Sequence, residues 1–311
     1  MTFSFCRLRF HFRAIDSLYF PPGKTGNLIR GAFGLIFRRL ACLPECAAVG
    51  AGGHQANCPY ARVFEPRATR GEAPSGLRDW PRPFLFRARH LDGLRIAREA
   101  GFWFDVHLFD ATEPPIEPFV LSFAQLAVEG IGPRRGRAWL LSADQLDTED
   151  NCVATVYNPE NAGPSPPGPP SVLDLTPWPS APRRVRVRFL SPTELKSVGL
   201  ATEPEFPVLF GRLRDRISTL RALYGEGPLP LDFQAMGERA KQVRMIGCDI
   251  HREESQRRSG RTGQTHSIGG FTGEADYEGE LAEFLPFLAA SRWTGVGRQT
   301  VWGKGELSIE Y

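Results

Sequence analysis

A glycine-rich segment near the C-terminal end has the composition of a polyanion-binding loop. Residues 295–305 read Gly-Val-Gly-Arg-Gln-Thr-Val-Trp-Gly-Lys-Gly. Glycine tolerates positive φ, and because it lacks a Cβ it lets a phosphate approach the backbone N–H groups. The two cations supply charge, and Trp302 offers a stacking face for a base, although glycines before an edge strand can also serve turn geometry alone. We expect RNA contacts from Gly295, Gly297, Arg298, Gly303, Lys304 and Gly305.

Three cysteines and a histidine lie close together in the N-terminal half, in the pattern Cys42-x3-Cys46-x7-His54-x3-Cys58. Three thiolates and an imidazole form a tetrahedral zinc site when they converge. The spacing is not that of a standard zinc finger, and a role as small apolar residues in a loop accounts for the cysteines without any metal. His54 can instead act as a general base. A metal-bound imidazole has no free lone pair, so these two roles exclude one another.

A second basic segment, residues 251–261, follows an expected strand and has the composition of a β-hairpin arm. Arginines in such an arm contact phosphates, which positions an RNA without specifying its sequence. Two glutamates in the segment offset part of the charge, so a solvated polar loop is the alternative. We expect phosphate contacts from Arg257, Arg258 and Arg261.

The C-terminal half contains six segments whose patterns predict regular structure. Polar and apolar residues alternate over 184–190, as in a half-buried strand. Apolar residues recur at helical spacing over 206–224, and Gly225 follows as a helix stop. Further elements are expected as strands over 243–250, 270–277 and 305–311 and a helix over 280–290. The resulting order, β-α-β-β-α-β, is the ferredoxin-like arrangement.

The N-terminal half can be divided in the same way. Alternation over residues 3–15 predicts a strand, and an apolar face over 25–40 predicts a helix. On this helix, Arg30, Arg38 and Arg39 face either the cleft between the expected domains, where they would contact RNA, or solvent. The other expected elements are strands over 83–88, 101–109 and 138–142, the last continued by 153–157, and a helix over 119–128. A duplicated β-α-β-β-α-β unit explains both halves, and one larger α+β domain with a long insertion is the alternative.

A proline-rich stretch over residues 159–182 separates the two halves. Proline removes a backbone donor, so we expect this stretch neither to continue a helix nor to join a sheet. The sequence therefore predicts an N-terminal domain over 1–158, a linker over 159–182 and a C-terminal domain over 183–311.

Composition limits the class of protein. The net charge is +3, with arginines clustered over 183–188, 212–216, 252–261 and 292–298, and guanidinium groups suit phosphate. No apolar run is long enough to span a bilayer, and the residues after Met1 do not resemble a signal peptide. We expect a cytoplasmic protein, in which six cysteines do not form a disulfide framework.

Segments at both ends of the chain resemble one family. Residues 269–279, Phe284-Leu-Pro-Phe-Leu288 and the glycine-rich segment are similar to the C-terminal half of CRISPR-associated endoribonucleases of the RAMP superfamily, which process precursor crRNA. Leu28-Ile-Arg-Gly-Ala-Phe-Gly34, the 42–58 segment and Cys58-Pro-Tyr-Ala-Arg-Val-Phe-Glu65 resemble the first helix and following loop of that family. The glycine-rich pattern alone is typical of RNA-binding relatives in general, whereas the two-ended combination is more specific to the processing enzyme.

The resemblance implies a fold and a reaction. The fold would be α+β, with tandem ferredoxin-like, RRM-like domains that hold a CRISPR repeat RNA. The reaction would need no metal, because the 2′-hydroxyl upstream of the scissile bond attacks the adjacent phosphate. The products would be a 2′,3′-cyclic phosphate and a 5′-hydroxyl. Such a reaction needs a base, a donor to the leaving oxygen and cations that stabilise the developing charge.

The family often places a catalytic histidine on or just after the first helix. The helix expected here contains none, so the resemblance points to His54 in the following loop, with Lys24 near the helix start as the neighbouring cation. His251 and His266 are alternatives beside the arginine-rich segment. The remaining histidines are expected to be structural or simply exposed: His11, His90 and His107.

Two other functional classes fit the same residues. One is a non-catalytic RAMP subunit that holds crRNA in an effector complex without cutting it. The other is an interaction module that structural zinc stabilises through the cysteine cluster. The expected partners are CRISPR repeat RNA within precursor crRNA and, for the first alternative, subunits of a CRISPR effector complex.

Overall fold

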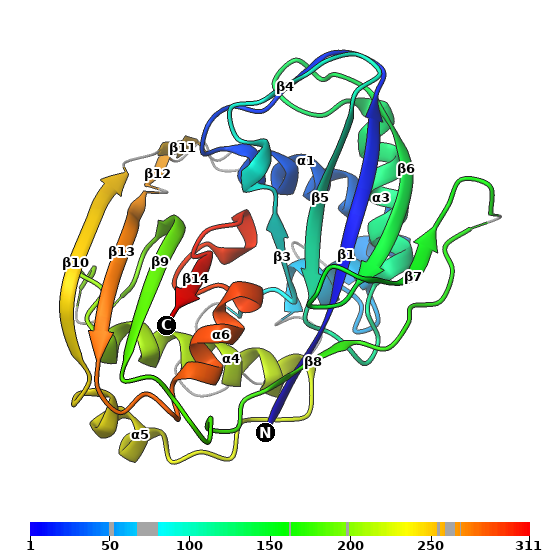
Figure 1. Ribbon diagram of the computed structural model, residues 1–311. Helices are drawn as coiled ribbons and strands as arrows, with labels where there is room; N and C mark the ends of the chain where they lie inside the picture. The colour runs from blue at the N-terminus through cyan, green and yellow to red at the C-terminus, as the bar shows by residue number, and fades with distance from the viewer. Residues whose placement is uncertain are drawn as a thin grey trace. The chain divides into compact units, whose positions relative to one another are not determined.

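The computed structural model describes residues 1–49, 53–66, 80–161, 163–196, 199–253, 256–258, 265–267 and 269–311. The chain forms two compact units (Figure 1). The N-terminal unit consists of residues 4–172 and 223–226, and the C-terminal unit of residues 1–3, 173–222 and 227–311. Each unit contains an antiparallel sheet and helices, as the α+β expectation requires.

The N-terminal unit has the β-α-β-β-α-β order that the sequence predicts. Its sheet has the strand order β3-β5-β1-β6-β7, and its neighbouring strands pair antiparallel. The first and third strands of the motif lie side by side at the centre, which is the ferredoxin-like topology. The elements are β1 (Thr2–Ala14), α1 (Thr25–Ala41), β3 (Phe84–Arg87), β5 (Gly101–Leu108), α3 (Ile116–Glu129), β6 (Ala138–Leu146) and β7 (Cys152–Tyr157). Strand β7 is separate from β6 and pairs with it as a hairpin, rather than continuing it.

Phenylalanine side chains fill the core between this sheet and its helices. Alternate residues of β1 face the helices, so Phe10 contacts Phe123 of α3 with ring centroids 4.5 Å apart. From α1, Phe33 meets Phe123 at 4.6 Å and Phe119 at 4.8 Å. These rings are almost completely buried, and they fix the position of α1 and hence of the segment that follows it.

Short elements complete the N-terminal unit. The 3-10 helix η1 (Pro44–Val49) and helix α2 (Pro59–Phe64) follow α1. The Phe64 ring of α2 lies 5.5 Å from Phe37 of α1 and 5.4 Å from Phe84 of β3. The remaining short elements are β2 (Leu18–Tyr19), which pairs with β4 (Arg95–Ile96), and the 3-10 helix η3 (Arg89–Leu91).

The C-terminal unit repeats the topology. Its sheet has the order β10-β13-β9-β14, and its chain order is again β-α-β-β-α-β. The main elements are β9 (Arg184–Thr193), α4 (Phe206–Tyr224), β10 (Arg244–Glu253), β13 (Gly270–Glu278), α6 (Leu285–Thr294) and β14 (Leu307–Glu310). The helix α4 ends before Gly225, where the sequence predicts its stop.

Helix α6 lies further along the chain than the periodicity predicts. It begins at Leu285 and ends at Thr294, whereas the expected helix spans 280–290. Pro286 explains the start, because proline is accommodated in the first turn of a helix but not in its interior. Gly295 explains the end, because its φ of 66° terminates the helix.

Two features of the C-terminal unit lie between the main strands. Helix α5 (Phe233–Ala240) was not predicted, although Asp232 caps it by accepting a hydrogen bond from the Ala235 N–H. The expected hairpin arm is present as β11 (Gln256–Arg258) and β12 (Thr265–Ser267), which pair antiparallel.

The arginines of β9 form an ion-pair ladder with acidic residues on neighbouring strands. Arg186 donates two hydrogen bonds to Asp276 of β13, at 2.7 and 2.8 Å. The other pairs are Arg184–Glu278, Arg244–Glu278, Arg186–Glu274, Arg188–Glu274 and Arg188–Glu310. The arginine cluster at 183–188 therefore neutralises carboxylates within the sheet and is not evidence of phosphate binding.

One part of the proline-rich stretch joins a sheet, contrary to prediction. Strand β8 (Ser171–Asp174) pairs with β1, and the Leu175 N–H donates to the Met1 carbonyl. The reason is local, because residues 171–175 contain no proline and keep all their backbone donors. The division between the two units falls within this strand.

No helix in the described part of the chain is long and apolar enough to cross a membrane.

Candidate functional site

The glycine-rich segment connects α6 to β14 and is held by its own backbone. The Val296 N–H donates to the Gly305 carbonyl, and the Gly305 N–H donates to the carbonyl of Pro192 in β9. Between them lies the short 3-10 helix η4 (Thr300–Trp302). Ser191 links the two sides, since its hydroxyl donates to the Gly303 carbonyl and accepts from the Glu306 N–H. The segment is therefore a closed loop fixed on the sheet edge.

Two of its glycines are required by the loop's own packing. A Cβ on Gly305 would lie 1.9 Å from the Val296 carbonyl oxygen, and one on Gly297 would lie 2.4 Å from the Glu194 carbonyl oxygen. Both residues also have positive φ, of 66° and 77°. Close backbone approach within the protein thus accounts for these glycines without an RNA. Their contact with RNA stays a prediction.

The two cations of the loop differ in their environment. Arg298 is 57% exposed and forms an ion pair with Glu194. Lys304 is only 6% exposed, and its Nζ lies 3.3 Å from the Gly269 carbonyl oxygen. Burial lowers the pKa of Lys304 from 10.5 to about 8, although Glu194 and Glu253 oppose the shift. Arg298 is thus the loop cation that solvent and an anionic ligand can reach.

The other expected RNA-binding arginines lie in two places. Arg257 and Arg258 belong to β11, and Arg261 lies outside the described residues. On α1, the guanidinium carbon of Arg38 lies 5.7 Å from the centre of the Tyr60 ring, and that of Arg30 lies 5.3 Å from the Phe64 ring. Both α1 arginines therefore cover aromatic side chains of α2.

Lys24 lies at the start of α1, where the sequence predicts it, and its side chain is exposed. It occupies the N-cap position but makes no side-chain capping hydrogen bond. Asp92 supplies the cap instead, because its Oδ1 accepts from the Thr25 N–H at 3.1 Å and from the Thr25 hydroxyl at 2.5 Å. The carboxylate satisfies the first turn of the helix and fixes the backbone next to Lys24.

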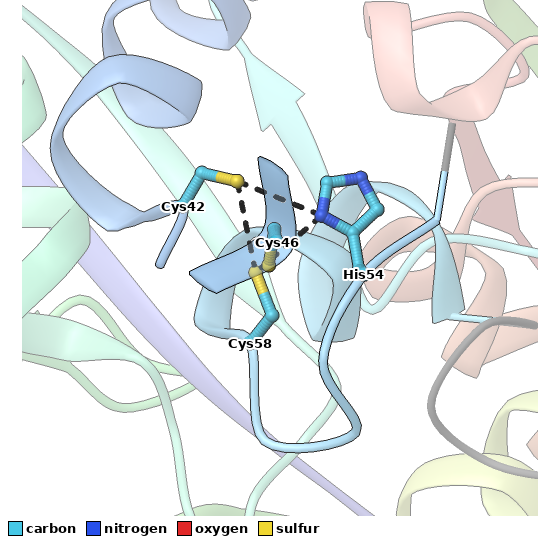
Figure 2. A group of neighbouring side chains, drawn as sticks. All are labelled: Cys42, Cys46, His54 and Cys58. Carbon is cyan, nitrogen blue, oxygen red and sulfur yellow. Dashed lines mark hydrogen bonds between the residues drawn. The ribbon is translucent and has the colours of Figure 1, made fainter. Parts of the chain in front are cut away.

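The cysteine cluster brings four potential metal ligands together in the described part of the chain. Cys42 ends α1, Cys46 lies in η1, His54 follows in the loop, and Cys58 precedes α2. Figure 2 shows the four side chains turned toward one another. Their ligand atoms all lie within 4.8 Å of one another. His54 Nδ1 is 3.5 Å from Cys42 Sγ and 3.7 Å from Cys58 Sγ, and the two sulfurs are 4.0 Å apart. This arrangement can hold a zinc ion.

The surroundings of the cluster act on its thiols and imidazole. Burial raises the pKa of Cys42. Burial also raises the pKa of Cys58, but hydrogen bonds from the backbone at Ala61 and Leu43 act in the opposite direction. The net result is a pKa below the ordinary value. The His54 side chain is 4% exposed, and its Nε2 lies 3.6 Å from a carboxylate oxygen of Glu65. An imidazole this enclosed is poorly placed to reach a substrate hydroxyl.

Family comparisons agree with the two-unit topology and with both ends of the chain. The family AF_1859_N, described as an N-terminal domain, matches residues 3–168. The family of the CRISPR-associated endoribonuclease Cas6 matches residues 187–307, which include the whole glycine-rich loop. The chain carries a domain of the Cas6 family of CRISPR-associated endoribonucleases over residues 187–307. It is therefore an RNA-cleaving enzyme of precursor-crRNA processing, as the sequence predicts.

Solved Cas6 structures share the fold along the whole chain. A Cas6 product complex superposes with a TM-score of 0.55 at 16% identity and covers 99% of both chains. Thermus thermophilus Cas6 gives a TM-score of 0.53 at 16% identity, covering 99% of this chain and 98% of that one. A chain of a partial Cas6-RT-Cas1–Cas2 complex gives 0.55 at 9% identity, with 46% of that chain covered. No curated protein sequence matches the chain.

Three carboxylates that contact the expected site residues or their helix were not expected from the sequence. Glu65 faces His54, Asp92 caps α1, and Glu194 pairs with Arg298. Each is distant in the sequence from its partner, or separated from it by a loop, so periodicity gave no signal. Of the three carboxylates, only Glu65 lies within a segment that resembles the family.

Proposed function

We propose that this Cas6 cuts precursor crRNA within the CRISPR repeat without a metal ion. The 2′-oxygen upstream of the scissile bond forms a new bond to phosphorus, and the bond from phosphorus to the 5′-oxygen breaks. A base takes the 2′-hydroxyl proton, and the 5′-oxygen receives a proton. The products are a 2′,3′-cyclic phosphate and a 5′-hydroxyl. Since the substrate supplies its own nucleophile, the protein has to supply only proton transfer, orientation and positive charge.

The observation that carries this proposal is the pair of β-α-β-β-α-β units with the Cas6 glycine-rich loop between the last helix and last strand. In the loop, Arg298 is the exposed cation that contacts the RNA backbone. Its guanidinium group would leave the ion pair with Glu194 and bind a phosphate instead. Lys304 can contribute only if its amine leaves the Gly269 carbonyl. The hairpin β11–β12 adds Arg257 and Arg258 to the RNA-binding surface.

Lys24 is the proposed catalytic cation, because it is exposed and its backbone is fixed by the Asp92 cap of α1. A lysine there can stabilise the developing charge or protonate the leaving oxygen. For His54 the burial of the ring and the two nearby sulfurs favour a ligand role over the role of general base. Arg30 and Arg38, which lie on α1, remain proposed RNA contacts.

A cleavage assay tests the proposal with a precursor RNA that contains a hairpin CRISPR repeat. We expect a single cut per repeat in buffer that contains EDTA and no added divalent ion, with a cyclic phosphate end. A single 2′-deoxy substitution upstream of the cut should abolish cleavage but not binding. Strict dependence on Mg²⁺, or cutting of the 2′-deoxy RNA, contradicts the mechanism.

Two further outcomes distinguish the alternatives. Tight binding of the repeat without cutting would identify a crRNA-holding subunit of an effector complex. For catalysis, Lys24→Ala should reduce the rate of cleavage by about 10²-fold with little change in affinity. Lys241→Ala, at an exposed lysine that pairs with Glu238 on α5, is the matched control and should cut normally. An equal loss of cleavage rate in both variants would show that Lys24 is not a catalytic residue.

A further inference from the structure

We infer that Cys42, Cys46, His54 and Cys58 bind one structural zinc ion, with His54 coordinating through Nδ1. The inference is independent of the cleavage mechanism. It concerns four side chains that the RNA reaction does not require, and it assigns His54 to a metal site rather than to the chemistry.

Three of the distances between the ligand atoms are close to those of a zinc tetrahedron. With Zn–S bonds of about 2.3 Å and Zn–N bonds of about 2.0–2.1 Å, ligand atoms lie roughly 3.5–3.8 Å apart at tetrahedral angles. The two sulfur–nitrogen distances here are 3.5 and 3.7 Å, and the Cys42–Cys58 sulfur distance is 4.0 Å. All four ligand atoms lie within 4.8 Å of one another. The longest of these separations would have to shorten by up to about 1 Å to complete the coordination sphere.

The orientation of the imidazole agrees with metal binding. Nδ1 faces the sulfurs (Figure 2), while Nε2 lies 3.6 Å from Glu65 Oε2. A carboxylate at the second ring nitrogen is the usual partner of a metal-bound histidine, because it fixes the tautomer and the ring. Tyr60 extends this arrangement, since its hydroxyl donates to Glu65 at 3.5 Å. The sulfur of Cys46 also accepts a hydrogen bond from the Gln55 N–H.

The ligand set favours zinc over the other common ions. Thiolates and imidazole are soft or borderline ligands, whereas Mg²⁺ and Ca²⁺ prefer oxygen. Four protein ligands also close the tetrahedron and leave no position for water, so the ion would have a structural role. A single disulfide would pair only two of the three cysteines and would leave the inward-facing imidazole unexplained.

The site would fasten a segment that has little regular structure. The ion would join the end of α1, the helix η1 and the start of α2. Residues of α2 already pack on the phenylalanine core through Phe64. Zinc would thereby fix the position of this segment on the core. Short helices are not held in place by packing alone.

Metal analysis of the intact chain tests the site directly. Protein purified without chelator should contain about one equivalent of zinc. Cys46→Ser and Cys58→Ser should lose it, and the protein reconstituted with Co²⁺ should show the visible absorption of a tetrahedral thiolate site. Cys152→Ser and Cys248→Ser replace exposed cysteines outside the cluster and should keep full zinc. Protein without zinc that also fails to bind Co²⁺ would overturn the inference, whether or not it cuts RNA.

The variant His54→Cys separates a ligand from a general base. A thiolate can replace imidazole in a structural zinc site, so we expect His54→Cys to keep about one equivalent of zinc and to cut RNA within about threefold of the normal rate. His54→Ala should lower zinc content and thermal stability. Cleavage that falls by about 10²-fold or more in His54→Cys with zinc retained would assign the histidine to catalysis and contradict the ligand role.

Discussion

Lys304 shows how a residue chosen for its charge can have a different role in the fold. Its amine is enclosed by the loop and donates to the Gly269 carbonyl, and burial lowers its pKa from 10.5 to about 8. Residue type alone indicated a phosphate contact. The sequence could not show that the side chain turns inward, because that direction depends on contacts with residues far away along the chain.

The lowered pKa predicts how stability depends on pH. Between about pH 8 and 10.5 the unfolded chain holds the Lys304 proton more often than the folded chain, so stability should rise with pH across this window. Lys304→Met should remove this rise and stabilise the protein by up to about 3 kcal/mol near pH 7, with the gain vanishing above about pH 10.5. Urea unfolding of both proteins across the window measures the difference. A constant difference would show that Lys304 is not buried as a charged group.

Gly305 offers a second test at the residue scale. Because an added Cβ would lie 1.9 Å from the Val296 carbonyl oxygen at positive φ, Gly305→Ala should cost about 3 kcal/mol or more in free energy of unfolding. Gly211→Ala on α4 meets open space and is the control, with an expected gain of about 0.5–1 kcal/mol. Denaturant unfolding gives both values. If Gly305→Ala folds normally but loses RNA binding, the glycine serves the ligand and not the loop.

At the scale of elements, regular patterns were predictable and local exceptions were not. The order of strands and helices in both units follows from the spacing of apolar residues, as with Phe10 and Phe33, which reach one core. Pro286 moved α6, and the proline-free residues 171–174 formed β8 inside a stretch that looked like a linker. Both exceptions depend on which individual residues have a backbone N–H donor. A pattern taken over a whole segment does not show this.

The ladder between β9 and β13 predicts a response to acid. Hydrogen bonding to Arg186 holds the pKa of Asp276 below its ordinary value, so its stabilising effect is present above that value and is lost as the pH falls through the lowered pKa. Both side chains are partly exposed, so we expect Asp276→Asn to cost only about 0.5–1 kcal/mol near pH 7. The difference from the unsubstituted protein should shrink as the pH falls from 7 through the lowered pKa of Asp276. Urea unfolding of both proteins along this pH series decides, and a difference that does not change with pH would exclude the ion pair as its cause.

At the scale of the whole molecule, the resemblance and the fold agree, but they do not identify the base. Both units have the ferredoxin-like topology, and the Cas6 family matches the C-terminal unit. The catalytic assignment was harder because His54 suits two chemistries, and only the geometry of three sulfurs around its ring favours one of them. Spacing along a chain does not give distances between atoms.

Removal of zinc should affect the two units unequally. Hydrogen exchange of the chelated protein should lose protection in η1, α2 and the end of α1, because these elements share the four ligands. Strands β9 and β14 should exchange at unchanged rates. Re-addition of Zn²⁺ should restore the protection. Uniform loss across both units would mean that the cluster supports global stability instead of one local segment.

The Asp92 cap on α1 bears on the order in which the protein folds. The donors of Thr25 depend on a carboxylate 67 positions further along the chain. Until that long loop closes, the first turn of α1 has no side-chain cap, and an isolated helix end frays. We therefore expect the turn that carries Lys24 to become ordered only after β3 has joined the sheet and η3 has brought Asp92 into place, and a newly made chain that ends before Asp92 lacks this cap.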